Sequence, residues 1–190
     1  MFVKIISMAK GILFRVLKSV YGFQHWHLSP LESRPYAMDI IEFLNSRKTK
    51  KSVFEIGCGL GEIISSIDAV QRKGFDVDES VVAAAQFLFF WNDVEFRTGS
   101  FNEIVGHEVD YMILVNFTHD IHPSDLKRLL KTLTSRNLVD HLIVDEVGMV
   151  GYAFHHDFNN IVPNDYSLSK IFPASYAYER KVKIYSRNVE

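Results

Sequence analysis

Cysteine is nearly absent from this chain, since Cys58 is the single one among 190 residues. One cysteine cannot form an internal disulfide, and no group of cysteines and histidines has the spacing of a zinc site. We therefore expect a reducing, cytoplasmic location. An uncharged run long enough to span a bilayer is also missing, because Lys4, Lys10, Arg15 and Lys18 interrupt the apolar N-terminus. The N-terminus lacks a small-residue cleavage site as well, so we do not expect a secretory signal.

An excess of positive charge is missing too. The 21 basic residues are balanced by 23 acidic ones, which leaves a formal charge of −2. No lysine- and arginine-rich stretch interleaved with aromatic residues is present, so we expect no nucleic-acid partner. Internal repeats and low-complexity tracts are absent. A chain of this length with 47% apolar residues is sufficient for one globular domain with a real core.

The first 51 residues are expected to form a helical extension. Residues 2–20 read as an amphipathic helix in which Lys4, Arg15 and Lys18 share one narrow arc at about 100° per residue. Two interpretations of this helix stay open, namely burial against the domain and contact with a membrane surface. A second helix is expected at 34–46, and the polar run 46–51 reads as a solvated connector.

From residue 52 to 190 the pattern predicts an α/β domain. Short apolar strands are expected at 52–56, 73–77, 94–98, 111–116 and 141–147, and helices at 62–69, 80–90 and 123–134. Strands that alternate with helices indicate a parallel sheet covered on both faces. Residues 148–175 read as a long loop with one short helix at most, and 178–186 as a final, antiparallel strand at or near an edge.

The most informative motif is the strand that runs into three glycines. Gly57, Gly59 and Gly61 lie between this strand and the next helix, where glycine permits positive φ and close approach to a ligand. The spacing is GxGxG, and Glu62 occupies the position at which a dinucleotide-binding turn has its third glycine. A negative charge there disfavours a diphosphate and suits a cationic ligand. Two further acids support a nucleoside site.

Glu55 precedes the first glycine by two residues, and Asp76 ends the second strand, 21 residues after Glu55. An acid at the end of that strand hydrogen-bonds ribose hydroxyls in nucleoside-binding α/β folds. Glu55 lies where a carboxylate can bind or orient a ligand's ammonium group. A structural glycine turn flanked by surface acids is the plainer alternative.

On these residues the chain resembles the class I S-adenosylmethionine-dependent methyltransferases, over about residues 52–147. The resemblance implies a Rossmann-like, mostly parallel sheet with a C-terminal antiparallel strand, and S-adenosyl-L-methionine as cofactor. Glu55, Gly57, Gly59 and Gly61 match the first motif of the family, and Asp76 matches its ribose-binding acid. Ser100 stands where many members have an aspartate that contacts adenine, with Phe101 beside it. Asn116 lies in a segment that is similar to the one facing the transferred methyl group.

Candidate catalytic and acceptor residues are histidines in the loops that follow the strands. His119 follows the fourth strand, where a histidine of near-neutral pKa can remove a proton from a methyl acceptor; packing of the loop is the alternative. His155 and His156 lie in the loop after the fifth strand and are expected at the acceptor. With Asp145-Glu146 and Asp157 they offer acceptable metal ligands, but the spacing is not diagnostic, so we expect no metal.

The sequence therefore predicts a methyltransferase that acts on a small-molecule, glycan or lipid-linked acceptor. A non-catalytic cofactor-binding protein of the same fold is the alternative. A nicotinamide-dependent enzyme is disfavoured by the glycine spacing. The aromatic and polar segment with His25, Trp26, His27 and Tyr36 has two open interpretations, a cover over the cofactor or simple packing.

Overall fold

The computed structural model describes residues 2–49, 52–148, 151–172 and 176–188. Its strands form one seven-stranded sheet and are β1 (Ser52–Ile56), β2 (Gln71–Asp76), β3 (Glu95–Thr98), β4 (Glu108–Leu114), β5 (Leu138–Glu146), β6 (Tyr166–Ile171) and β7 (Lys181–Arg187). Their order across the sheet is β3-β2-β1-β4-β5-β7-β6. The first five strands are parallel, and β7 runs antiparallel to both β5 and β6. The predicted parallel sheet with a C-terminal antiparallel strand is confirmed.

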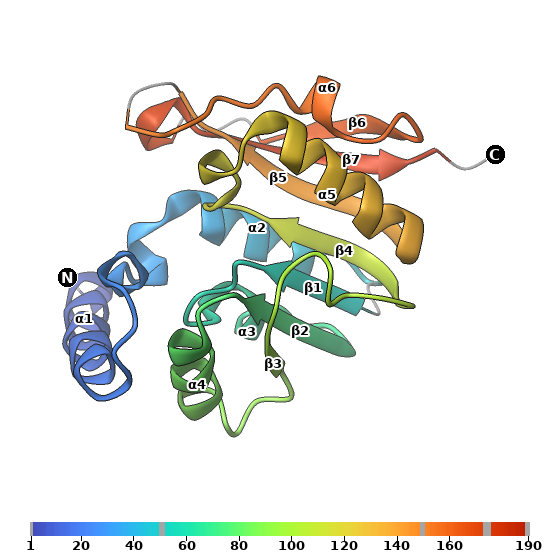
Figure 1. The fold of residues 1–190 in the computed structure, drawn as a ribbon. Helices are drawn as coiled ribbons and strands as arrows, with labels where there is room; N and C mark the ends of the chain where they lie inside the picture. The colour runs from blue at the N-terminus through green and yellow to red at the C-terminus, as the bar shows by residue number, and fades with distance from the viewer. Residues whose placement is uncertain (1, 50–51, 149–150, 173–175, 189–190) are drawn as a thin grey trace.

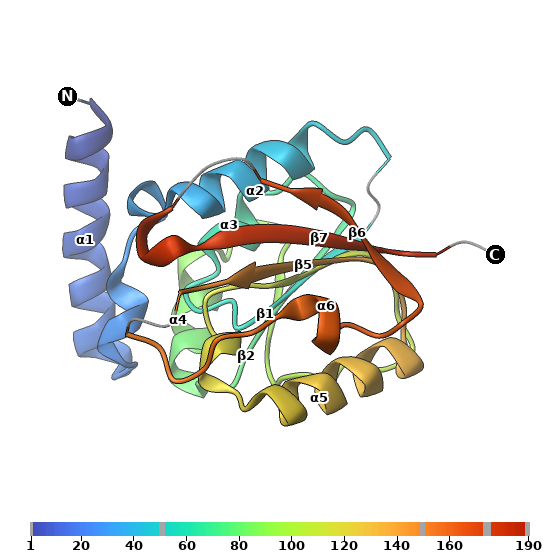
Figure 2. The ribbon, with the colours of Figure 1, turned by 90° about the horizontal axis from the view of Figure 1, so that it is seen from above.

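Helices cover both faces of this sheet. They are α1 (Phe2–Tyr21), α2 (Pro35–Asn45), α3 (Glu62–Ser65), α4 (Glu79–Leu88), α5 (Pro123–Arg136) and α6 (Phe158–Ile161). Short 3-10 turns lie at η1 (His25–Leu28), η2 (Leu31–Ser33), η3 (Thr118–Asp120) and η4 (Ala177–Glu179). Figure 2 shows α2 and α5 on opposite sides of the strands.

Successive side chains of β1 point to opposite faces of the sheet and contribute to two apolar layers. Val53 points into the layer that α2 and α3 cover, whereas Phe54 and Ile56 point into the layer under α5. All three side chains are buried. Since the strand is covered on both faces, its polar residues Ser52 and Glu55 are buried as well.

Helix α1 stands beside the sheet rather than on it (Figures 1 and 2). Its buried Phe14 and Leu17 pack with Val81 and Ala84 of α4 and with Leu60 of the glycine turn. The expected division after residue 51 falls beside residues 50 and 51, which lie outside the described residues, and the two-part organisation stays a prediction. In the described part of the chain, no helix is long and apolar enough to cross a membrane.

Two sequence predictions need correction. The stretch read as a loop up to residue 175 contains β6, an edge strand whose side chains after Tyr166 are exposed, so it lacks the apolar signal of a buried strand. The helix expected at 62–69 ends at Ser65, because Arg72 donates to the carbonyls of Ser65 and Ile67. Those carbonyls are thereby satisfied without a further helical turn.

Candidate active site

The glycine turn follows β1 at the carboxyl edge of the sheet. Gly57 and Gly61 have φ of 71° and 76°. A Cβ at Gly57 would lie 2.5 Å from the Phe117 ring, and one at Gly61 would lie even closer to the Phe96 ring. Both positions therefore require glycine for conformation and for space. The backbone turn itself forms the surface that a ligand meets.

The N–H groups of this turn are already used within the protein. Gly57 and Cys58 both donate to the carbonyl of Phe75, at 2.8 and 3.0 Å, and Gly59 donates to Oδ2 of Asp76 at 2.8 Å. A diphosphate is bound at such turns through free N–H donors. This turn therefore has few free N–H groups that could donate to a diphosphate.

Buried acids surround the turn. Glu55, at 3% exposure, accepts a hydrogen bond from the Ile64 N–H at 3.1 Å. Burial raises the pKa of Glu55 to about 8, although the Arg34 charge and the Ile64 hydrogen bond favour the ionised form. Asp76 is also buried, and its other oxygen accepts from the Asp78 N–H at 3.0 Å. A cation in this place would relieve the cost of ionising Glu55.

A cavity of about 550 Å³ joins the turn to the loops after β4 and β5. Of the residues expected at the cofactor and the reaction, the following line it: Glu55, Gly57, Gly59, Asp76, Ser100, Asn116 and His119. Gly61 lies behind the turn against Phe96 and is not among the lining residues. Ser100 donates its N–H to Glu103 Oε2 at 2.7 Å.

His119 lies in η3 with 6% of its surface exposed. Its ring centroid is 4.0 Å from that of Tyr152, and its Nε2 is 3.9 Å from Oδ2 of Asp120. Its Nδ1 has no hydrogen-bond partner within the described residues. Burial lowers the pKa of His119, against the opposing effect of Asp145 and Asp120. The ring is therefore neutral near pH 7 and able to accept a proton.

A buried cation organises the same end of the cavity. Arg180 forms an ion pair with Asp145 and donates to Oδ1 of Asn116 at 3.0 Å and to the Tyr152 hydroxyl at 3.1 Å. Its guanidinium also lies 4.3 Å from the centre of the Tyr36 ring. Asn116, which has a φ of 70°, donates its N–H to Asp145 at 3.0 Å. This network holds two lining residues, Asn116 and Tyr152, in place.

His155 and His156 do not line the cavity. His155 is exposed, and its Nδ1 lies 2.7 Å from the carbonyl of Val147. His156 is 2% exposed, and its Nε2 lies 2.8 Å from the carbonyl of Thr118, beneath the loop that carries His119. The structure thus gives both histidines contacts with loop carbonyls, and their acceptor role stays a prediction.

The acids considered as metal ligands have other partners. Asp145 pairs with Arg180, and Glu146 lies 2.5 Å from the Lys183 ammonium. Across the described ranges, no group of three or more histidine, cysteine, aspartate or glutamate side chains is placed to hold a metal ion.

The segment before α2 forms one wall of the cavity. Trp26, His27 and Arg34 line it, and the His27 ring covers the turn so closely that a Cβ at Gly59 would lie 2.9 Å from its Nδ1. His25 and Tyr36 are not lining residues. The segment therefore packs over the turn, and a cover over the bound cofactor stays a prediction. Burial lowers the pKa of His27.

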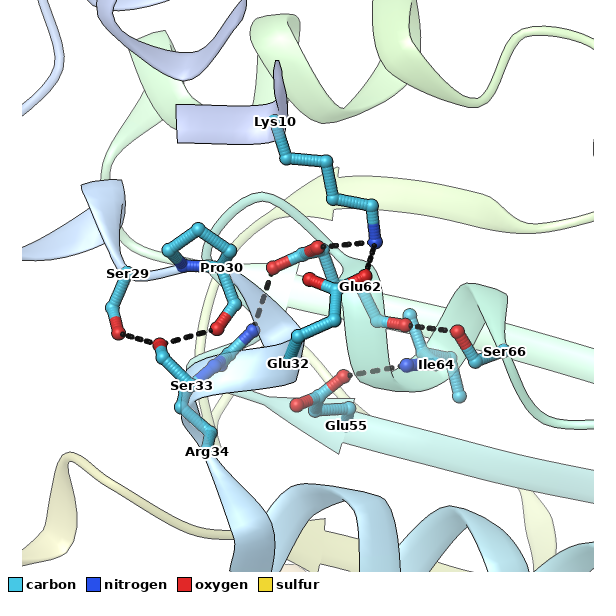
Figure 3. A network of polar contacts seen from close by, with 10 residues as sticks. All are labelled: Lys10, Ser29, Pro30, Glu32, Ser33, Arg34, Glu55, Glu62, Ile64 and Ser66. Carbon is cyan, nitrogen blue, oxygen red and sulfur yellow. Dashed lines mark hydrogen bonds and ion pairs between the residues drawn. The ribbon is translucent and has the colours of Figure 1, made fainter. Parts of the chain in front are cut away.

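Glu62 fastens this wall to the turn (Figure 3). Its carboxylate is 2.8 Å from Nη2 of Arg34 and 3.3 Å from Nζ of Lys10, and Lys10 also contacts Glu32 at 2.5 Å. Burial raises the pKa of Glu62, against the effect of Arg34 and Lys10. From the sequence, Glu62 was expected only to favour a cationic ligand over a diphosphate. In the structure its carboxylate also forms ion pairs within the protein.

Arg34, Tyr152 and Arg180 are among the lining or supporting residues that sequence reasoning missed. Each comes from a segment without a recognisable motif. Arg180 stands directly before β7, and its burial is known only from the fold, so the sequence offered no signal for it.

Solved structures of other proteins share this fold. Magnesium protoporphyrin IX methyltransferase from Synechocystis PCC 6803, crystallised with bound SAM, superposes with a TM-score of 0.70 at 16% identity, covering 97% of this chain and 96% of that one. The N-methyltransferase NodS from Bradyrhizobium japonicum WM9, in complex with S-adenosyl-L-homocysteine, gives 0.70 at 11% identity, covering 91% and 97%. The fold is that of a class I methyltransferase. No protein-family model matches the sequence, and no curated protein sequence matches it significantly.

In the methyltransferase fold seen here, the cavity lies at the carboxyl ends of the parallel strands, where ligands bind in open α/β sheets. Most of its lining residues come from the ends of the parallel strands and the loops that follow them, and others come from the segment before α2.

Proposed function

We propose that this chain transfers a methyl group from S-adenosylmethionine to a small-molecule acceptor. One observation carries the proposal: a single cavity is lined both by an acid-flanked glycine turn and by the buried His119, whose pKa is lowered by burial. The first feature suits the cofactor, and the second suits removal of a proton from the acceptor.

The chemistry of the turn fits S-adenosylmethionine better than a nicotinamide dinucleotide. Four acids line the cavity at this end, and they are Glu55, Glu62, Asp76 and Asp78. The sulfonium and ammonium charges of the cofactor complement these acids, whereas a diphosphate would face them with its own negative charge.

Two side chains match the remaining polar groups of the cofactor. Asp76, at the end of β2, is a charged acceptor for ribose hydroxyls. Arg34 lines the cavity, and its buried Nε has no hydrogen-bond partner in the described part of the chain. A carboxylate such as that of the methionine moiety would satisfy this donor.

The cofactor supplies an electrophilic methyl group when bound. The chain's own contribution is to position and deprotonate the acceptor. His119 would take the acceptor's proton, and Tyr152, which lies against the His119 ring, would confine the acceptor beside it. Holding the reactants in line supplies much of the acceleration in such a displacement.

The acceptor class is proposed more broadly as a small molecule, a glycan or a lipid-linked molecule, in a cytoplasmic location. The alternative is a protein that binds the cofactor without catalysis. Incubation of the protein with methyl-labelled S-adenosylmethionine and a cell extract, followed by counting of label in small molecules, lipids and glycans, separates the two. We expect label in one fraction with the wild type. Bound cofactor with no label in any fraction would leave the binding function alone.

A further inference from the structure

Helix α1 presents a continuous apolar face to solvent. Residues one turn apart form a row along this face, and Leu13 lies beside the row. Their exposed fractions are Met8 70%, Ile12 60%, Val16 54%, Val20 72% and Leu13 43%. Isolated exposed apolar residues are ordinary, but a contiguous row of them marks a surface that another body covers.

The orientation of this row is fixed by the opposite side of the helix. Phe14 and Leu17 are buried against α4 and the glycine turn. Lys10 holds the same side through its contacts with Glu32 and Glu62 (Figure 3). The apolar row therefore points outward because the inner side of α1 is already engaged.

The charge of α1 indicates what covers the row. The segment from Phe2 to Tyr21 contains four basic residues and no acidic one, although the whole chain has a formal charge of −2. Lys10 contacts Glu32 and Glu62 on the inner side of the helix. Arg15 is exposed beside the apolar row, and half-buried Lys18 lies on the helix surface beyond Arg15, farther from that row. A wide apolar face bordered by basic side chains is the pattern of helices that lie in the surface of an anionic bilayer.

The apolar surface continues past the end of α1. Phe87 of α4 is 57% exposed, and its ring centroid lies 6.2 Å from that of Tyr21. Trp26, 63% exposed, is the fifth residue after the end of α1 and lines the cavity. The helix thus stands next to the wall of the cavity.

We propose that the outward face of α1 docks the protein on anionic lipid bilayers. Ile12, Val16 and their neighbours would enter the boundary between headgroups and acyl chains, with Arg15 among the headgroups. This docking is independent of methyl transfer, because none of the outward residues lines the cavity.

The test is co-sedimentation of the full chain with vesicles of phosphatidylcholine, alone or with phosphatidylglycerol. We expect the wild type to sediment with the anionic vesicles and to remain largely in solution with the neutral ones. Ile12→Glu and Val16→Glu should each weaken binding by about tenfold or more, since burial of such a side chain corresponds to at least a decade in affinity. Arg15→Gln should weaken it by about fivefold, the effect of one basic residue near an anionic surface.

The matched control is Val70→Glu, because Val70 is 85% exposed and lies outside α1. This variant should bind as the wild type does, and circular dichroism checks that all variants keep their helical content. Wild-type protein that stays in solution with both vesicles would overturn the proposal, as would equal binding by Ile12→Glu. A wild-type dimer in sedimentation velocity that Ile12→Glu dissociates, without vesicle binding, would assign the face to a second copy instead.

Discussion

Two parts of the cavity are built in different ways. We call the part around the glycine turn the cofactor end, and the part around Asn116 and His119 the acceptor end, after the proposed function. At the cofactor end, the turn and its acids come from residues 55–78, and the glycine backbone forms much of the surface. At the acceptor end, Tyr36, Asn116, Tyr152 and Arg180 meet from four separate parts of the chain. The cofactor end is therefore formed mainly by residues close together in sequence, whereas the acceptor end is formed by residues that only folding brings together.

The ends also differ in how their charges are compensated. Asp145 at the acceptor end is fully buried but ion-paired with Arg180 and hydrogen-bonded by the Asn116 N–H. Glu55 at the cofactor end is buried with one hydrogen bond from Ile64, and its pKa is raised to about 8. Burial raises the pKa of both carboxyl groups, but Asp145 has a direct ion pair within the chain, whereas Glu55 would gain from an added cation.

The strongest test of the acceptor end is His119→Ala. If His119 removes the acceptor's proton, turnover should fall by roughly 10²–10⁴, while the affinity for S-adenosylhomocysteine stays near that of the wild type. Labelled methyl transfer and calorimetry measure the two quantities. His122→Ala is the control, because His122 caps α5 and does not line the cavity. Unchanged turnover in His119→Ala would assign acceleration to positioning by Asn116 and Tyr152 instead.

The requirement for glycine at position 61 is tested by the free energy of unfolding of alanine variants. Gly61 and Gly106 have nearly equal φ, 76° and 75°, but a Cβ meets the Phe96 ring at Gly61 and nothing within 4 Å at Gly106. Gly106→Ala should cost about 1–2 kcal/mol for the left-handed conformation alone. Gly61→Ala should cost a further ~1–3 kcal/mol for overpacking. Urea denaturation measures both, and equal losses would show that the Phe96 contact imposes no constraint.

Asp76→Ala probes the ribose contact at the cofactor end. Hydrogen bonds to a charged group contribute about 1.5–3 kcal/mol each, so S-adenosylhomocysteine affinity should fall by roughly tenfold or more. Because Asp76 also accepts from Gly59 and Asp78, Asp76→Asn is the companion variant that retains an acceptor at the same place. An affinity equal to that of the wild type in both variants would place the ribose elsewhere.

Glu55 gives the smallest and most specific effect. Since its pKa is about 8 in the free protein, the carboxyl carries a proton at pH 7. A ligand ammonium nearby favours the ionised form and lowers this pKa, so binding should release up to about one proton at pH 7. Calorimetry in buffers of different ionisation enthalpy detects the release. It should vanish in Glu55→Gln; the same release in that variant would exclude Glu55 as its source.

The sequence was sufficient to locate the glycine turn and its acids because strand, glycines and acid follow one another in fixed spacing, whereas Arg34 beside them was missed. Glu55, Gly57 and Asp76 were predicted from that spacing, and all three line the cavity. The parallel sheet followed from the alternation of apolar strands and helices in the same way.

The acceptor end was only partly predictable. His119 was found because it follows a buried strand, but Arg180 and Tyr152 reach the site through tertiary packing of the chain's last third. His156 was predicted at the acceptor because it lies in the loop after the fifth strand. The structure buries it beneath η3 and outside the cavity lining, and its acceptor role stays a prediction. The edge strand β6 escaped prediction because exposed edge strands carry little apolar periodicity.

The central claim is that the cavity binds S-adenosylmethionine through the acid-flanked glycine turn. Calorimetric titration of the wild-type chain with S-adenosylhomocysteine, and separately with NAD, tests it most directly. We predict saturable binding of S-adenosylhomocysteine and no binding of NAD, because the turn offers acids and few free N–H donors. Saturable binding of NAD with no response to S-adenosylhomocysteine would contradict the claim.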